Sequence, residues 1–278
     1  MEKLLKFCLS GLFVFLWSCT SSSYSDLTVE ERKELADEKW ESNKPIQGSP
    51  ASQTLLDEII ALDSLHCDAI REKSVPYLKR GMAYQWKPLF DKAIACDPNT
   101  WQPMRGYLYL YFYRDYKKAI IDFNASDVLT PNFVDAPQGH SVNYWRGIAY
   151  IGLNDYEKAL DFFTKHIDIE LKTLTEDWIE PSAFLYLGIA QYELGQLEMA
   201  EVNFNKMLLY NKGLSADANY YLATVYKDKN EKQKALTYIK KAIANYEAGH
   251  FRSRHYVEEI RQVYMEQLIA LQEEIKRL

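Results

Sequence analysis

Four stretches of the chain repeat the same order of small, apolar and aromatic positions, and this pattern predicts four helical hairpins over residues 99–249. In each stretch a small residue of the first helix precedes an alanine of the second by twelve or thirteen positions. These pairs are Gly106 with Ala119, Gly147 with Ala159, Gly188 with Ala200, and Ala223 with Ala235. The first spacing is the longer one, which indicates a one-residue insertion near Tyr113. The hairpins follow one another at 41, 41 and 35 residues (106 to 147 to 188 to 223), so extra residues are expected in loops at 132–138 and around 171–177.

The segments before these hairpins predict further helices. Residues 90–98 have the pattern of a second helix, and we expect a degenerate terminal hairpin over 51–98 whose first helix contains Leu78, Gly81 and Tyr84. Residues 55–63 are amphipathic and are expected to pair with that hairpin. Residues 28–40 start with a helix-capping threonine and an acidic first turn, which favours a short helix within the tether and linker of 19–50.

The end of the chain predicts one long amphipathic helix within residues 250–278. Its apolar residues recur every three or four positions from Val257 to Leu278, which is the spacing of one helix face. Two interpretations remain open. The helix caps the last hairpin, or its apolar stripe binds a partner helix or folds into the groove of the array.

Composition and charge narrow the classes of function. Hydrophobic residues make up 47% and charged residues 26%, as in folded proteins, while the 11 Gly and 9 Pro are too few for a turn-rich all-β protein. The net charge of -6 makes nucleic acid an unsuitable partner, because binding to a phosphate backbone needs a basic face.

The N-terminus resembles a bacterial lipoprotein signal. Residues 1–18, the predicted signal peptide, combine lysines with an apolar run of 7–17 that is too short to span a bilayer, and Leu-Trp-Ser-Cys at 16–19 is like a lipobox. The resemblance implies that Cys19 is acylated and carries the chain, with palmitate, on the outer membrane facing the periplasm. The alternative is a plain secretory signal that leaves Cys19 unmodified. If Cys8 leaves with the signal and Cys19 is acylated, Cys67 and Cys96 are the thiols that remain, either joined in a disulfide or buried as small apolar side chains.

The repeated hairpins, with the sequence from Gly147 to Leu160 as the most specific match, are similar to the tetratricopeptide repeat, a helix–turn–helix of about 34 residues. The resemblance implies an all-α, right-handed α-solenoid of four to five hairpins with a C-terminal capping helix. It also implies that the first helices line a concave groove. The candidate groove residues are Tyr107, Tyr111, Tyr144, Ile148, Leu185, Ile189, Tyr192 and Tyr220.

Such an apolar, tyrosine-rich surface suits an extended peptide or an amphipathic helix of a protein partner. The alternative is that these bulky residues only pack neighbouring helices or lie beneath the C-terminal helix.

Sequence motifs for catalysis, metals and cofactors do not occur. The five histidines include no HExxH pair, there is no CxxC, and no phosphate-binding or dinucleotide glycine motif is present. We therefore expect no enzyme, no cofactor and no metal, and a membrane-anchored scaffold that binds a protein or peptide in the cell envelope. Three alternatives stay open: an outer-membrane assembly-machinery lipoprotein, a glycan-binding lipoprotein and a toxin-immunity lipoprotein. The glycan-binding protein would need an exposed Trp101, Trp145 or Trp178 to stack on a sugar.

Overall fold

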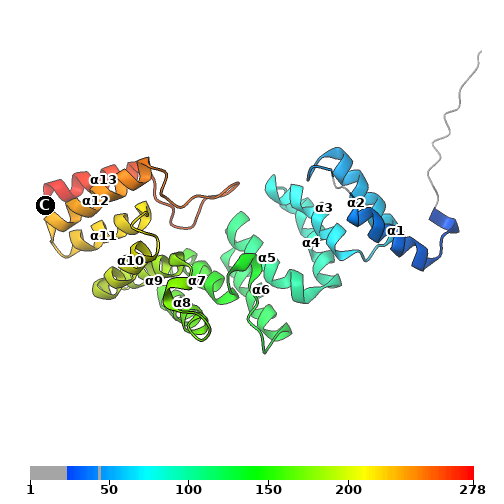
Figure 1. The fold of residues 1–278 in the computed structure, drawn as a ribbon, viewed down its shortest axis with the longest axis horizontal. Coiled ribbons are helices and arrows are strands. Elements are labelled where there is room, and N and C mark those ends of the chain that lie inside the picture. The colour runs from blue at the N-terminus through cyan, green and yellow to red at the C-terminus, as the bar shows by residue number, and fades with distance from the viewer. Residues whose placement is uncertain (1–23, 43–44) are drawn as a thin grey trace, which may run out of the picture. The chain divides into compact units, whose positions relative to one another are not determined.

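The computed structural model describes residues 24–42 and 45–278, so the predicted signal peptide and Cys19 lie outside the described residues. The described part contains thirteen α-helices, three short 3₁₀ segments and no strand (Figure 1), which confirms the all-α prediction. It divides into two compact units, whose boundary along the chain lies between His66 and Cys67, and each unit is described by itself. None of its helices has both the length and the apolar character needed to cross a bilayer.

The first unit is a pair of helices, α1 (Val29–Glu41) and α2 (Pro50–Leu62), preceded by η1 (Tyr24–Asp26). Thr28 caps α1 as predicted: its side chain accepts from the backbone N–H of Glu31, whose carboxylate accepts from the N–H of Thr28. The two helices pack against each other, with Lys39 2.9 Å from the carboxylate of Glu58. Residues 55–63 therefore pair with α1 within this unit.

The second unit begins with the hairpin of α3 (Cys67–Lys79) and α4 (Ala83–Cys96). A disulfide joins Cys67 to Cys96 and so ties the start of α3 to the end of α4. The helix bounds differ from the prediction, because Gly81 lies in the turn with φ +71° and Tyr84 lies in the second helix. Glycine readily adopts a left-handed φ, and this conformation ends a helix. The apolar spacing from Leu78 to Tyr84 therefore indicates one helix where the chain turns between two.

Four further hairpins follow where the repeats predict them. They are α5 (Pro98–Phe112) with α6 (Tyr116–Leu129), α7 (Val142–Gly152) with α8 (Tyr156–Glu170), α9 (Pro181–Glu193) with α10 (Leu197–Tyr210), and α11 (Ala216–Asp228) with α12 (Lys232–Glu247). The inserted residues form the predicted loops between hairpins, which contain η2 (Pro137–Gly139) and η3 (Glu176–Trp178). The first hairpin turn holds the extra residue: the N–H of Asp115 reaches the carbonyl of Tyr109, six residues back, whereas Asp155 bonds Tyr150, five residues back.

Glycine in the first helix makes room for a phenylalanine of the second. A Cβ added to Gly147 would lie 2.7 Å from Cζ of the buried Phe163, which is inside van der Waals contact. The same relation holds for Gly106 with Phe123 and for Gly188 with Phe204. The fourth hairpin has Ala223, and there the corresponding position of α12 is the smaller Ile239. The close approach of the paired helices therefore rests on matched side-chain volumes.

The C-terminal part differs from the continuous helix predicted over residues 251–278. Helix α13 (Met265–Arg277) starts only at Met265, and it packs against α12 with Leu268, Leu271 and Ile275 buried, as a capping helix. Residues 250–264, which we call the strap, form the long non-helical connection drawn between α12 and α13 in Figure 1. Left-handed φ values at Tyr256 (73°) and Arg261 (60°) interrupt any helix there.

Candidate binding groove

The strap lies on the first helices of the hairpins. Its carbonyl at His250 accepts from the backbone N–H of Ala216 at the start of α11 (2.8 Å), and the N–H of Arg252 donates to the carboxylate of Asp217 (3.0 Å). Further along, the hydroxyl of Tyr186 on α9 donates to the carbonyl of Ile260 (3.0 Å). We call the surface of α5, α7, α9 and α11 beneath the strap the groove; the repeats predict a binding surface on these first helices, and here a segment of the same chain lies on it.

Glu259 is the central contact of the strap. Its carboxylate accepts hydrogen bonds from the hydroxyls of Tyr111 (3.1 Å) and Tyr186 (3.4 Å), which come from α5 and α9. The same carboxylate lies 3.4 Å from a guanidinium nitrogen of Arg252 and 3.7 Å from Nε of Arg254. Only 9% of the Glu259 side chain is exposed, so these partners compensate a charge that has lost most of its water.

Two of the three arginines of the strap lie over tyrosine rings of the groove. The guanidinium of Arg254 lies 3.6 Å from the ring centroid of Tyr111 and donates to the hydroxyl of Tyr107. The guanidinium of Arg252 lies 4.8 Å from the ring centroid of Tyr186. A cation over an aromatic face is attracted to the ring quadrupole, and the attraction grows as water is excluded.

The second half of the strap adds an apolar and a polar anchor. Ile260 and Val263 are buried, and Arg261 lies 3.1 Å from the carboxylate of Glu193 at the end of α9. Arg261 also donates to the hydroxyl of Tyr156 at the start of α8 (2.6 Å). The strap is therefore held along its whole length by side chains from several hairpins.

Burial fixes the protonation of the aromatic and imidazole groups in this region. It raises the pKa of Tyr111 and of Tyr186 well above the ordinary tyrosine value, so both hydroxyls stay protonated and donate to Glu259. Burial also lowers the pKa of His140, so its ring, whose centroid lies 4.7 Å from that of Tyr144, is neutral at pH 7. The charges of this region come from arginines, carboxylates and Lys79.

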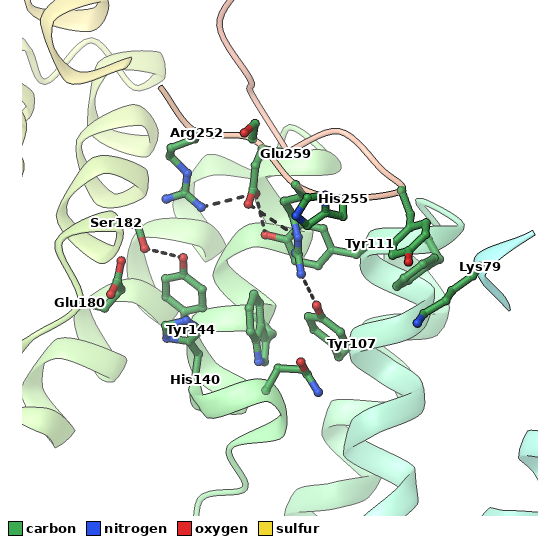
Figure 2. Close-up of a pocket in the computed structure, with 16 residues that line it drawn as sticks. Lys79, Tyr107, Tyr111, His140, Tyr144, Glu180, Ser182, Arg252, His255 and Glu259 are labelled. Carbon is green, nitrogen blue, oxygen red and sulfur yellow. Dashed lines mark hydrogen bonds and ion pairs between the residues drawn. The ribbon is translucent and has the colours of Figure 1, made fainter. Parts of the chain in front are cut away.

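A pocket of about 500 Å³ remains between the strap and the first helices (Figure 2). Its floor is an aromatic cluster in which the ring of Trp145 lies 5.0 Å from Tyr107, 5.6 Å from Tyr111 and 4.8 Å from Tyr144. The loops between hairpins reach its edge: Glu180 ends one of them, and the other contributes Gln138 and His140. The residues that lengthen the repeats therefore shape this pocket.

The structure brings together three of the eight predicted groove residues. Tyr107, Tyr111 and Tyr144 line the pocket, and the hydroxyl of Tyr144 shares a 2.7 Å hydrogen bond with Ser182. The other five do not line it: Ile148, Leu185 and Ile189 are buried, whereas Tyr192 of α9 and Tyr220 of α11 are half-buried. The hydroxyl of Tyr192 donates to Asp228 of α11 (2.7 Å).

Sequence reasoning missed the residues that the strap supplies and one tyrosine that receives it. Arg252, Arg254 and Glu259 lie in the range predicted as a helix, and Tyr186 is not among the candidate groove residues. One signal was available: residues 252–255 are polar or charged without an apolar position, which is unfavourable for a helix that packs by an apolar stripe.

Two further expectations concern ligand chemistry. Among the tryptophans named for sugar stacking, Trp101 and Trp145 are buried, and Trp178 is 75% exposed in the loop before α9. In the part of the chain that the structure describes, no group of three or more His, Cys, Asp or Glu residues is placed to hold a metal ion.

Comparison with known proteins gives one family match and many structural ones. Residues 140–173, which contain α7 and α8, match the tetratricopeptide repeat model. Among proteins with curated descriptions, no sequence matches. The fold resembles PilW, a type IV pilus biogenesis factor (16% identity, 87% of this chain and 97% of that one, TM-score 0.60).

Two other solved structures extend the likeness. One is pilF of Pseudomonas aeruginosa (14% identity, 79% and 92% covered, TM-score 0.56). The other is YrrB, described as a TPR protein with an unusual peptide-binding site (20% identity, 68% and 91% covered, TM-score 0.51). At these identities the likeness concerns the fold alone. The chain therefore has the fold of tetratricopeptide-repeat proteins, an α-solenoid of helical hairpins.

Proposed function

We infer that this protein is a membrane-anchored scaffold that binds an extended segment of a protein partner in the cell envelope. The observation that carries the proposal is the strap itself: a non-helical segment lies on the first helices and is held by side chains of α5, α8, α9 and α11. A surface that holds one extended segment in this way has the geometry and the chemistry to hold another.

The charge pattern and the fold support a binding role without catalysis. Stacked hairpins present a long surface made of many residues. The structures that resemble the chain include YrrB, whose description names a peptide-binding site, and PilW, described as a pilus biogenesis factor. A lipid on Cys19 would confine the scaffold to a membrane surface and raise its effective concentration towards partners there.

Site-specific photo-crosslinking in cells tests where a partner binds. A photoreactive amino acid replaces Gln138, which is exposed and lines the pocket from outside the strap, or Val128, which is 80% exposed on α6, a helix that contributes nothing to the pocket. The proposal predicts a crosslinked protein from position 138 and none from position 128. Crosslinks from position 128 alone would place the partner on α6 and contradict the proposal.

The predicted lipid anchor has its own test. Cys19→Ser removes the thiol that the lipid would modify, so we expect the protein to move from the membrane fraction to the soluble fraction of the envelope. A Cys8→Ser variant is the matched control, because Cys8 lies within the predicted signal peptide and leaves with it. Membrane retention of the Cys19→Ser variant would refute the lipid anchor and leave the binding proposal standing.

A further inference from the structure

We propose that the strap is an internal stand-in for the partner, and that the groove beneath it binds an extended, arginine-containing segment of another protein when the strap leaves. This inference rests on the proposed function and specifies both the chemistry of the partner and the control of its access. It follows from three features: the charges of the groove, the kind of contacts that hold the strap, and the way in which the strap is attached.

The groove offers carboxylates and tyrosine faces to the strap. Glu180, Glu193 and Asp217 belong to α9, α11 and their approaches, and each lines a pocket or contacts the strap. Two cationic side chains of the helical part also contact the strap and offset part of this negative charge: Lys79 lies 5.2 Å from the ring of Tyr256, and Arg114 donates to the carbonyl of Glu258. Because aromatic faces add negative potential, the uncovered surface favours a cationic ligand.

The strap supplies the complementary charge. Arg252, Arg254 and Arg261 all point to partners on the groove, whereas its two carboxylates are Glu258 and Glu259. The planar guanidinium suits this surface because it can stack on a tyrosine ring and donate hydrogen bonds at its edge at the same time. In the strap, Arg252 and Arg254 flank a single residue. We expect a partner segment to share this Arg-x-Arg pattern.

The contacts of the strap can be exchanged without opening the hairpins. They are mainly hydrogen bonds, ion pairs and ring–cation contacts at a partly open pocket, so a foreign chain or water can replace them. The strap is also bounded by structure at both ends: Gly249, with φ +81°, ends α12, and α13 packs back onto α12. The strap can therefore leave the groove while both flanking helices stay in place.

Competition with the strap determines the affinity that a partner experiences. The apparent dissociation constant is the intrinsic one divided by the fraction of molecules whose groove is uncovered. Weakening the strap without altering the groove should therefore tighten binding. Glu259→Gln does this, because it removes the carboxylate between two guanidinium groups and changes no groove residue. Glu258→Gln is the matched control: it removes the same charge one residue earlier, from an exposed side chain that contacts Tyr264 of the same segment.

The experiment measures binding of a fluorescein-labelled peptide with the sequence of residues 249–262 to the purified soluble Cys19→Ser chain by fluorescence anisotropy. We expect the Glu259→Gln variant to bind it at least about tenfold more tightly than the parent chain and the Glu258→Gln variant, whose straps compete. A second peptide, with glutamine at the positions of Arg252 and Arg254, should lose this binding. Circular dichroism and thermal melting of each variant show that its hairpins are folded.

Two results would overturn the inference. Equal peptide affinity of the parent chain and Glu259→Gln, with both folded, would show that the strap does not compete. Equal affinity of the arginine and glutamine peptides for Glu259→Gln would show that the groove does not select guanidinium groups. If partners still crosslink at position 138 in either case, the proposed function stands and only this inference falls. If crosslinks are absent as well, the proposed function falls with it.

Discussion

The interfaces within the hairpins and the interface beneath the strap are both filled by aromatic side chains, but different forces hold them. Within a hairpin, Phe163 fits the space that Gly147 leaves, and the contact is apolar and repeats along the chain with a regular spacing. Beneath the strap, Tyr111 and Tyr186 use their hydroxyls and ring faces to hold Glu259 and two arginines, and within the described residues this arrangement does not repeat from hairpin to hairpin.

The difference teaches which part of the molecule can move. Side chains that close the gap between paired helices have no substitute, since their loss leaves a cavity. Polar contacts at an accessible surface have substitutes in water and in the side chains of a partner. The hairpins therefore act as a framework and the strap as a removable cover, and variants of the two regions should behave differently.

The largest effect is expected from the framework. Phe163→Ala should lower the free energy of unfolding by about 3–5 kcal/mol, because it leaves a cavity between α7 and α8. Chemical denaturation followed by circular dichroism measures this loss. Gly147→Ala should cost less, through a Cβ pressed against Phe163, and adding Phe163→Leu to it should restore part of the stability. If Phe163→Ala unfolds at the same denaturant concentration as the parent chain, the volume-matching argument is wrong.

A smaller effect is expected at the N-terminal end of the second unit. Replacing both Cys67 and Cys96 by serine frees the ends of the α3–α4 hairpin and should lower the free energy of unfolding by about 2–4 kcal/mol, mainly by making the unfolded chain less constrained. Comparing denaturation of the oxidised chain with and without reductant measures the same quantity. No change on reduction would contradict a stabilising role for the disulfide.

Acid should destabilise the framework through His166. Its ring lies between hairpin elements, with Nδ1 2.9 Å from Oγ of Ser141, and burial lowers its pKa to about 4 from 6.5. The unfolded chain therefore binds this proton at a higher pH than the folded chain does. The contribution of the neutral His166 ring to the free energy of unfolding is fully present above pH 6.5. It falls by up to about 3 kcal/mol as the pH drops towards 4.

His166→Asn keeps a polar group near Ser141 and removes the titration. Denaturation curves at pH 7, 6, 5 and 4 should show a smaller loss for this variant than for the parent chain. Parallel losses in the two proteins over this range would assign the acid sensitivity to other groups.

The sequence predicts the framework well because its determinants are local. Gly106 and Ala119 lie thirteen positions apart and meet in one hairpin, where a Cβ on Gly106 would lie 3.2 Å from the carbonyl oxygen of Ala119, so their spacing alone predicts their contact. The strap could not be predicted in this way, since Tyr111 and Glu259 are separated by 148 residues and meet only after several hairpins have stacked. Its polar contacts also leave no periodic pattern, and the helical spacing of Val257, Ile260 and Tyr264 favoured a helix that left-handed residues interrupt.

The central claim, that the strap is a cover separable from the framework, is tested most directly by trypsin cleavage after Arg252 and Arg254, measured together with the melting temperature. Both arginines are held in the groove by Glu259, so cleavage reports how often the strap leaves it. We expect Glu259→Gln to raise the cleavage rate at least about tenfold over Glu258→Gln while both variants melt within about 2 °C of the parent chain. Equal cleavage of the two variants, or faster cleavage accompanied by an equally large loss of melting temperature, would contradict the account.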